Sequence, residues 1–187
     1  MPEITIRTAQ PSDAEELLKI YAPYVTETAV TFEYDVPTVS EFAERISSTL
    51  ENYPYLAAVQ NGEIIGYAYA GRFKSRAAYD YAVEVTVYVR RDKRRSGVGK
   101  LLYSRLEEIL KAQNITNLYA CIAYTENTDD FLTNDSADFH SHMGYRMIGV
   151  FKKCGYKFNR WYDMVWMEKM INEHVRKPAE IIPFKAL

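Results

Sequence analysis

The stretch Val83–Lys100, VEVTVYVRRDKRRSGVGK, is the feature that most constrains how this chain can fold. Its first seven residues place a valine at every second position, which is typical of a β-strand with one buried face. A basic turn, Arg94–Lys100, follows and contains glycines at positions 97 and 99. An apolar helical pattern then continues to about Gln113. The sequence therefore predicts a strand, a tight turn and a helix in direct succession.

The turn has the chemistry of a phosphate site. Glycine lets the backbone turn tightly and bring its N–H groups close to a ligand. The start of the helix adds unpaired N–H donors and the positive end of the helix dipole. We therefore expect a phosphate or pyrophosphate at this turn. The residues predicted to bind it are Arg94, Arg95, Ser96, Gly97, Val98, Gly99 and Lys100.

Composition excludes several classes of protein. The chain has 187 residues, enough for one domain with a sizeable core, and its net charge of −2 gives no overall attraction to nucleic acid or an anionic membrane. Its two cysteines, Cys121 and Cys154, form no CxxC motif, which is typical of a reducing compartment. The N-terminus has no apolar signal segment, and no apolar run approaches the length of a membrane span. We expect a cytoplasmic protein without nucleic-acid or membrane partners.

The pattern predicts helices and strands along the chain in the order βα(α)βββαβαββ. An Asn-Gly pair at residues 61–62 between two apolar runs is the strongest hairpin signal. The strands are expected at residues 4–7, 55–59, 64–70, 83–89, 118–123, 145–153 and 161–170. The helices are expected over about four turns from Ser12, at residues 38–50, from the basic turn to Gln113, and around residues 136–143. The other segments read as loops, and the tail from Asn172 reads as an appendage that packs on a neighbouring chain.

Glu84 is the candidate general base. In the alternating strand it shares a face with Thr86 and Tyr88, opposite the valines. A carboxylate inside so apolar a strand is costly to bury unless it is paired or faces a wet cleft. The sequence alone leaves an alternative open, in which Glu84 lies on an edge strand, in solvent or in an ion pair, and has no role in catalysis.

Several blocks, taken in order, carry a resemblance to a known family. The spacing Arg94-x-x-Gly97-x-Gly99 after a strand resembles the acetyl-CoA pyrophosphate loop of the GNAT superfamily of N-acetyltransferases. Further blocks resemble its phosphinothricin acetyltransferase-like subgroup: YAPY at 21–24, VTFE at 30–33, FKSRAAY at 73–79, FHSHMGY at 139–145 and GYKFNRWYD at 155–163. The likeness spans about residues 4–170. The family's asparagine ahead of the helix histidine is out of register here, at Asn134, and the loop before it is longer and more acidic.

The resemblance implies a fold and a reaction. The fold is mixed α/β, with a mostly antiparallel central sheet of about 6–7 strands flanked by about four helices. It would occupy a domain at residues 1–171, followed by the tail extension at 172–187. The reaction is transfer of the acetyl group of acetyl-CoA to the amino group of a small amino acid or analogue, such as phosphinothricin, methionine sulfoximine or methionine sulfone. Attack is direct, in a ternary complex, and no metal is implied.

The resemblance also assigns residues. Glu84 becomes the catalytic carboxylate, and His140 the acid that protonates the CoA thiolate; His142, on another helix face, is expected to be structural. The predicted coenzyme contacts outside the basic turn are Val87, Tyr88, Val89 and Asn134. The predicted acceptor contacts are Phe32, Arg76 and Tyr79. Members of the subgroup tend to be homodimers, so a homodimer is expected.

Two other functions remain open from the sequence. The first is a GNAT enzyme with a different acceptor, such as a polyamine, an aminoglycoside or a protein N-terminus; the acidic stretch at 124–135 keeps this alternative open. The second is a CoA-binding module without catalysis, against which the presence of both Glu84 and His140 counts.

Overall fold

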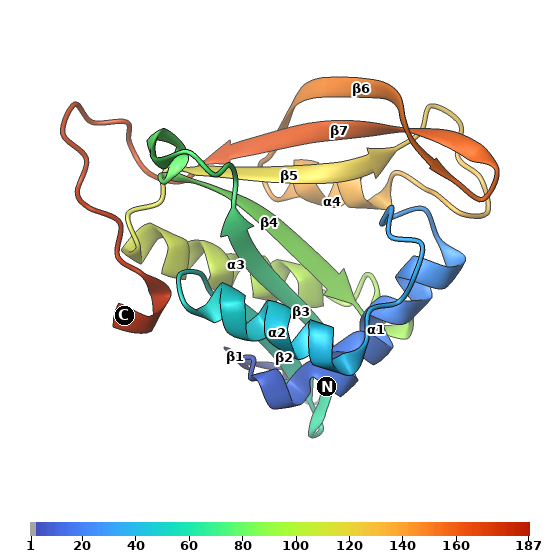
Figure 1. Cartoon of the computed structure of the whole chain (residues 1–187), viewed down its shortest axis with the longest axis horizontal. Coiled ribbons are helices and arrows are strands. Elements are labelled where there is room, and N and C mark those ends of the chain that lie inside the picture. Colours follow the sequence, from blue (N-terminus) through green and yellow to red (C-terminus); the bar gives the residue numbers. More distant parts are fainter. Residues whose placement is uncertain (1–2) are drawn as a thin grey trace. The chain divides into compact units, whose positions relative to one another are not determined.

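The computed structural model describes residues 3–187. Within them the chain forms four α-helices and seven β-strands (Figure 1). The chain divides into two compact units. The first contains Met1–Ile20, Pro37–Leu118 and Met170–Leu187, and the second contains Tyr21–Val36 and Tyr119–Lys169. Each strand pairing with a described register is antiparallel, which confirms the predicted mixed α/β class with mostly antiparallel pairing.

The strands of the first unit lie in the order β1-β2-β3-β4. Their bounds are Thr5–Thr8 for β1, Tyr55–Gln60 for β2, Glu63–Arg72 for β3 and Ala82–Val89 for β4. The hairpin predicted at Asn61 and Gly62 joins β2 to β3, and both turn residues have positive φ, 54° and 81°. Two successive residues with positive φ make a turn whose twist matches that of the flanking strands.

Helices α2 (Val39–Leu50) and α3 (Val98–Ala112) cover opposite faces of these strands (Figure 1). Tyr67 of β3 points toward α2, because its ring lies 6.2 Å from that of Phe42. The preceding residue, Gly66, faces α3, where a Cβ would come within 3.1 Å of the Val98 side chain. Successive residues of a strand point to opposite faces. The two helices therefore enclose the strands from both sides.

Helix α1 (Ala14–Glu27) begins later than the cap predicted at Ser12. Residues Pro11–Asp13 form a 3-10 turn. Ser12 therefore lies inside this turn, and the α-helix starts only at Ala14. The Asp13 carboxylate accepts from the backbone N–H of Gln10 (2.8 Å) and from the Arg7 guanidinium (2.6 Å). The aspartate therefore closes the turn and ties it to β1.

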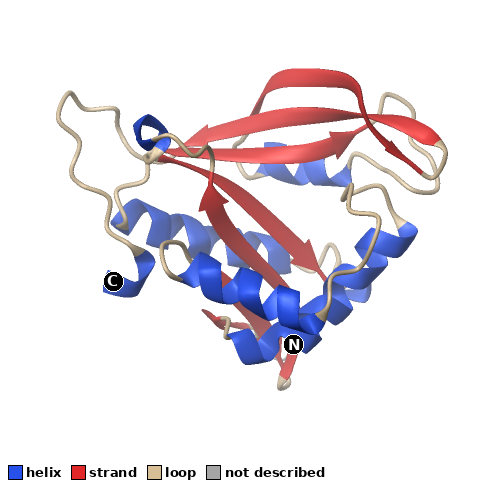
Figure 2. Cartoon of the chain, viewed as in Figure 1, coloured by secondary structure: helices blue, strands red, loops and turns tan. Residues whose placement is uncertain are grey.

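The strands of the second unit lie in the order β5-β7-β6, with bounds Asn117–Tyr124, Arg160–Met170 and Arg146–Lys157. Figure 2 shows β6 and β7 as a long twisted ribbon, with helix α4 (Asp135–His142) along one side of the three strands. The connection between β6 and β7 is shorter than the predicted one, residues 155–160. Strand β6 continues to Lys157, so that only Phe158 and Asn159 form the turn, both with positive φ (51° and 58°). The sequence hid this because a bulge interrupts the alternation of β6.

The tail packs on its own unit. The buried Gln113, at the end of α3, donates from Nε2 to the carbonyl oxygens of Asn52 (2.8 Å) and Ile182 (2.7 Å). Its backbone carbonyl accepts from the Ile182 N–H at 3.2 Å, and the Phe184 N–H donates to the Asn52 carbonyl at 3.0 Å. The Gln113 amide thus joins the tail to the ends of α2 and α3, together with these backbone bonds.

Replacing Gln113 by leucine is expected to lower the free energy of unfolding by about 1–3 kcal/mol, because two carbonyl groups then lose a buried donor. Urea unfolding followed by circular dichroism measures the change. The matched control is His174→Ala, which removes an exposed bond to Asn117 (2.7 Å) and should change stability by no more than about 0.5 kcal/mol. Equal stability of Gln113→Leu and the unmodified protein would show that the tail is held by other contacts.

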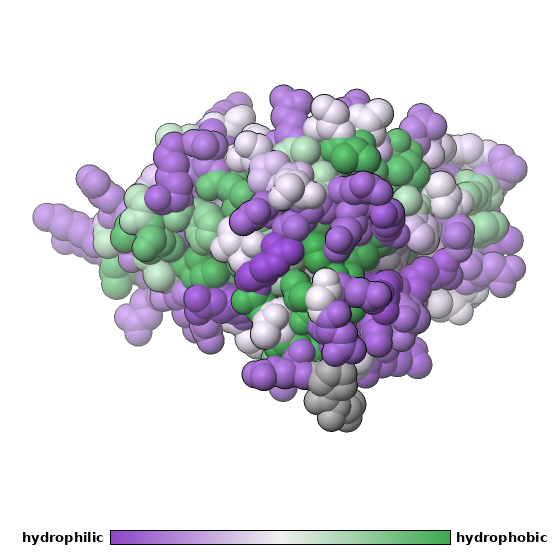
Figure 3. All heavy atoms as spheres, turned by 90° about the horizontal axis from the view of Figure 1, so that it is seen from below, coloured by the Kyte–Doolittle hydropathy of each residue, from purple (hydrophilic) through white to green (hydrophobic). Residues whose placement is uncertain are grey.

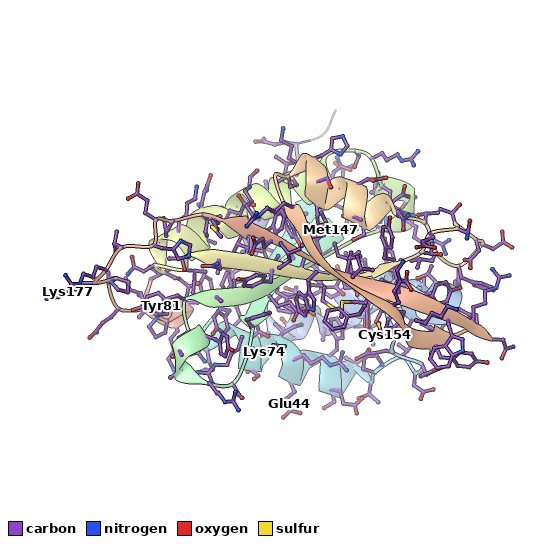
Figure 4. All side chains as sticks on the ribbon, turned by 90° about the horizontal axis from the view of Figure 1, so that it is seen from above. Glu44, Lys74, Tyr81, Met147, Cys154 and Lys177 are labelled. Atoms are coloured by element: carbon purple, nitrogen blue, oxygen red, sulfur yellow. The ribbon has the colours of Figure 1, made fainter. Side chains whose placement is uncertain are left out.

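Figure 3 shows one face on which hydrophilic residues predominate and apolar patches are interspersed. Among residues 3–187, no helix has the length and apolarity needed to span a membrane. Neither Cys121 nor Cys154 is in a disulfide, both are exposed, and Figure 4 places Cys154 on the β6 ribbon.

Candidate functional site

The basic turn after β4 is built as a helix N-terminus open to a ligand. A short 3-10 turn at Arg91–Lys93 follows the strand, and the chain then reverses through Arg95 (φ 61°) and Gly97 (φ 86°). Gly97 is the N-cap of α3 and, having no side chain, gives the first turn no side-chain cap. The first N–H groups of a helix have no partner within the helix, so this end suits an anion. The structure thus brings the predicted phosphate residues together in one loop.

The basic side chains of this loop lie at the surface. Arg94, Arg95 and Lys100 are exposed, while Val98 is buried against the sheet and fixes the first turn of α3. The Ser96 hydroxyl donates to the carbonyl of Lys93 at 2.5 Å, which closes the loop from within. Charge is therefore presented outward from a loop that is anchored on its inner side.

The second half of β4 carries the other coenzyme residues predicted in the first unit. Val87, Tyr88 and Val89 pair with Ala68, Tyr67 and Gly66 of β3, respectively. The rings of Tyr88 and Tyr67 lie 5.5 Å apart, so that Tyr88 shares the face of β3 that α2 covers. The strand runs straight into the basic loop, and its backbone is thereby fixed relative to α3.

Glu84 lies on the predicted face of β4. Val83 and Val85 are buried, whereas Glu84 is half-buried and lies opposite Gly71 of β3. A Cβ at Gly71 would meet no atom within 4 Å, so space remains open next to the glutamate. Burial raises the pKa of the Glu84 carboxyl, while the positive charge of Lys74 opposes this rise. Figure 4 places Lys74 on the loop that follows β3.

Arg76 and Tyr79 lie on that same loop, within the unit that holds Glu84. Arg76 is exposed and precedes the 3-10 turn Ala77–Tyr79. The ring of Tyr79 meets that of Phe73 edge-on, with 6.0 Å between centroids. A salt bridge of 3.0 Å from Arg72 to Asp80 closes the base of the loop. Two of the three predicted acceptor residues, Arg76 and Tyr79, are therefore placed on a braced surface loop.

His140 is buried in the second unit, with 3% of its surface exposed. Its Nδ1 lies 2.7 Å from the carbonyl oxygen of Ser136. Because a carbonyl only accepts, Nδ1 carries the proton and Nε2 holds the lone pair. The rings of Phe139 and Tyr145 meet the imidazole edge-on, at 5.3 and 5.2 Å. Burial lowers the pKa of His140 to about 4, against a smaller raising effect of the Ser136 bond, so the imidazole is neutral near pH 7.

This burial predicts a pH-dependent stability. Between pH 6.5 and 4 the unfolded chain binds a proton at His140 and the folded chain does not, so stability is lost as the pH falls. The free energy of unfolding should drop by about 2 kcal/mol from this group between pH 7 and pH 5. In His140→Gln this contribution should vanish from urea unfolding curves at the two pH values. The control is His142→Gln, at an exposed residue of the same helix, which should keep the full drop.

Asn134 and Phe32, also in the second unit, have structural contacts of their own. The Asn134 amide donates to the carbonyl of Thr125 (2.9 Å) and accepts from its N–H (3.3 Å), which closes the acidic loop. The resemblance predicts that Asn134 binds the coenzyme. In that role its amide would have to exchange these bonds to Thr125 for bonds to the coenzyme. Phe32 packs against a cluster of four buried residues: Ala29, Ala123, Leu132 and Tyr162.

The acidic loop is organised by Asp129, which sequence reasoning did not single out. Its carboxylate accepts from the N–H groups of Phe131 and Leu132 (2.8 Å each), from Arg160 (2.7 Å) and from the Tyr162 hydroxyl (3.0 Å). Burial acts to raise the pKa of Asp129, but these bonds outweigh it and the pKa is lowered. Burial, with the bond to Asp129, raises the pKa of Tyr162 to about 12. The sequence offers one signal for the local part of this arrangement: an aspartate in a loop often accepts from the backbone N–H two residues later.

No metal centre is evident in the part of the chain that the structure describes, because no three His, Cys, Asp or Glu side chains there are grouped to hold an ion.

Comparison with known proteins identifies the family. A family model described as an acetyltransferase (GNAT) domain matches residues 6–166. A phosphinothricin N-acetyltransferase of Streptomyces coelicolor is 33% identical over 171 residues, covering 89% of this chain and 96% of the relative. An L-methionine sulfoximine/L-methionine sulfone acetyltransferase of Salmonella typhimurium is 29% identical, covering 94% and 99%. The crystal structure of a GNAT superfamily phosphinothricin acetyltransferase from Sinorhizobium meliloti, in complex with AcCoA, superposes with a TM-score of 0.87 at 32% identity, covering 98% of this chain and 97% of that one. With a helix N-terminus after β4 that has no side-chain cap, and a domain match over most of its length, the chain belongs to the GNAT family of acetyltransferases.

Proposed function

We propose that this protein transfers the acetyl group of acetyl-CoA to the amino group of a small amino acid or analogue, of the phosphinothricin, methionine sulfoximine or methionine sulfone type. The observation that carries the proposal is the uncapped start of α3 at Gly97, directly behind a strand that holds a half-buried carboxylate. The similarity to enzymes named for these acceptors supports the acceptor class.

In the proposed complex the loop Arg94–Lys100 binds the pyrophosphate of acetyl-CoA. Backbone N–H groups at the start of α3 hydrogen-bond the phosphate oxygens, and the arginine and lysine side chains balance their charge. The pantetheine arm then lies along Val87, Tyr88 and Val89, whose backbone groups bind its amides. Binding along a fixed strand holds the thioester carbon within reach of the acceptor nitrogen.

Glu84 is proposed as the general base. The acceptor arrives as an ammonium ion and must lose a proton before its nitrogen can attack the thioester carbon. Burial brings the pKa of the Glu84 carboxyl closer to the pKa of the amine from which it takes the proton. The open space beside Gly71 leaves room for the amine or for a bridging water. When the C–N bond has formed, the C–S bond breaks and the electron pair leaves on sulfur.

His140 is proposed to deliver the proton that the CoA thiolate then requires. In the resting protein its proton is on Nδ1, toward Ser136. Nε2 must therefore first gain a proton. Glu84 takes the first proton of the ammonium ion, and the nitrogen releases a second one after the C–N bond has formed. This second proton passes to Nε2 and from there to the thiolate. We place this protonation inside the catalytic cycle, because a buried imidazole with a lowered pKa is neutral at rest.

Phe32, Arg76 and Tyr79 are proposed to bind the acceptor. Arg76 is suited to the carboxylate of an amino acid through a paired hydrogen bond. A polyamine or aminoglycoside acceptor would need free acidic groups, and the central aspartate of the acidic loop, Asp129, is used on Arg160 and Tyr162. This observation favours the amino-acid acceptor over a polycationic one.

We further propose a cytoplasmic homodimer. Strand β6, at the end of the strand order, exposes Met147, Ile148, Val150 and Phe151, which suits contact with a second subunit. Sedimentation of the purified protein tests the dimer, and Phe151→Lys should shift it toward the monomer if β6 forms the contact.

A thiol-release assay with acetyl-CoA tests the activity. Methionine sulfone, methionine sulfoximine and phosphinothricin are expected to be acetylated, while spermidine and an aminoglycoside are not. Turnover with spermidine alone would favour the polyamine reading. Saturable CoA binding by calorimetry without turnover of any of these amines would favour a CoA-binding module.

A further inference from the structure

The segment Thr28–Glu33, between α1 and α2, is anchored from the β6–β7 hairpin. Lys157, on β6, is buried with 3% of its surface exposed. Its ammonium donates to three backbone carbonyl oxygens, those of Val25 (2.7 Å), Thr28 (2.9 Å) and Thr31 (2.8 Å). An ammonium has three donors, and all of them are used here. The backbone on the N-terminal side of Phe32 is therefore tied to one point of β6.

The segment is also held by a tyrosine of α1. The Tyr21 hydroxyl lies 2.9 Å from the Thr31 hydroxyl and donates to the Glu33 carboxylate at 2.9 Å. Thr31 and Glu33 flank Phe32 directly. The backbone at Phe32 consequently has little freedom to shift as a unit.

The ring of Phe32 rests on Gly155. A Cβ built at Gly155 would overlap three ring carbons of Phe32 (Cδ2, Cε2 and Cζ), the farthest of them at 2.7 Å, where real Cβ atoms essentially never approach within 3.0 Å. Gly155 is buried and lies two residues from Lys157, on the same face of β6. The Phe32 ring can therefore occupy this position only because residue 155 has no side chain.

The bulge before Gly155 fixes this residue in turn. The pairing of β6 with β7 is shifted between Phe151 and Gly155. Asp163 of β7 accepts from the N–H of Lys153 at 2.8 Å and from the Lys152 ammonium at 3.0 Å. Lys153 has a positive φ of 50° at this bulge. The hairpin is thus braced where it supports the ring.

We propose that Gly155 is a positioning residue that determines acceptor specificity, because it sets where the Phe32 ring lies against the acceptor. The inference rests on the proposed function, in which Phe32 contacts the amino-acid acceptor. Since the flanking backbone is anchored, a side chain at 155 must turn or lift the ring and cannot displace the whole segment. The acceptor side chain then loses its contact surface, while the coenzyme site in the other unit is untouched.

Gly155→Ala tests the proposal, with steady-state kinetics for methionine sulfone and for acetyl-CoA. A displacement of about 1 Å at a binding group can lower turnover roughly 100-fold, so we expect kcat/KM for the acceptor to fall roughly 10- to 100-fold, mainly through KM. The KM for acetyl-CoA should stay within about twofold. The matched control is Gly149→Ala on the same strand, where a Cβ would meet no atom within 4 Å and the kinetics should not change.

A double-mutant cycle with Phe32→Ala separates this route from a general effect. In Phe32→Ala the ring is gone, so adding Gly155→Ala should change neither the acceptor KM nor stability. If Gly155→Ala alone is too unstable to assay, Phe32→Ala/Gly155→Ala should recover the stability of Phe32→Ala. An unchanged acceptor KM in Gly155→Ala, an equal loss with and without the Phe32 ring, or no recovery in the double variant would each overturn the proposal. Failure of the unmodified protein to acetylate any amino acid would instead refute the proposed function, and the stability cycle would still test the packing.

Discussion

Glu84→Gln is expected to lower kcat for acetyl transfer by roughly 10²- to 10⁴-fold near neutral pH, the range that a positioned general base supplies. The amide has nearly the shape of the carboxyl group but cannot take a proton. Glu84 is half-buried on β4 beside the open space at Gly71, so the substitution should leave the strand intact. Turnover of methionine sulfone at saturating substrates measures the loss, and calorimetry should show unchanged CoA affinity.

The pH dependence gives a second view of the same residue. The active form is the carboxylate, so kcat/KM should rise with pH through the pKa of Glu84. Burial raises that pKa. The rising limb of the plot of kcat/KM against pH should therefore lie above the ordinary value of 4.5 for a glutamate. In Glu84→Gln this limb should be absent.

The control for this prediction is Glu63→Gln, at an exposed glutamate of β3 that pairs with Arg90 (2.9 Å), which should retain both the rate and the limb. If Glu84→Gln kept full turnover at moderate pH, Glu84 would not be the base, although the coenzyme site would stand.

Gly97→Val is expected to weaken CoA binding by roughly 5- to 30-fold, which corresponds to the cost of about 1–2 kcal/mol for an L-residue in the left-handed region. Gly97 has φ 86° and forms the N-cap of α3. A β-branched residue relaxes away from this conformation and turns the first N–H groups of the helix away from the pyrophosphate. Calorimetric titration with CoA measures the change in affinity.

Gly62→Val is a closely matched control. Gly62 also has positive φ (81°), and at both glycines a Cβ would meet no atom within 4 Å. The two variants should therefore lose similar stability, since the strain is the same. Only Gly97→Val should lose CoA affinity, because Gly62 lies in the β2–β3 hairpin. Equal CoA affinity of the two variants would place the pyrophosphate elsewhere.

Short-range patterns were sufficient for most elements of the fold. The Asn-Gly pair specified the β2–β3 hairpin, and the alternation around Glu84 correctly put Val83 and Val85 on the buried face. The errors occurred where a local pattern was broken. The 3-10 turn at Pro11–Asp13 moved the start of α1, and the bulge in β6 made the end of that strand resemble a loop.

The side-chain environments of the second unit could not be predicted in this way. The sequence marked His140 as an acid, but its burial and its bond to Ser136 show a neutral imidazole with the proton on Nδ1. It marked the acidic loop as a possible acceptor surface, whereas Asp129 is engaged by Arg160, from a distant strand. Burial and long-range partners set these states, and neither follows from local spacing.

The sequence by itself determined the succession of strand, glycine turn and helix at Val83–Lys100, because those features depend on neighbours within a few residues. Only the tertiary structure decided that Gly155 supports the ring of Phe32 and that Lys157 binds the carbonyls beside it. These contacts join residues far apart in the chain, and they depend on the register of β6 beyond its bulge. A shift of one residue there would turn both side-chain positions to the other face of the strand.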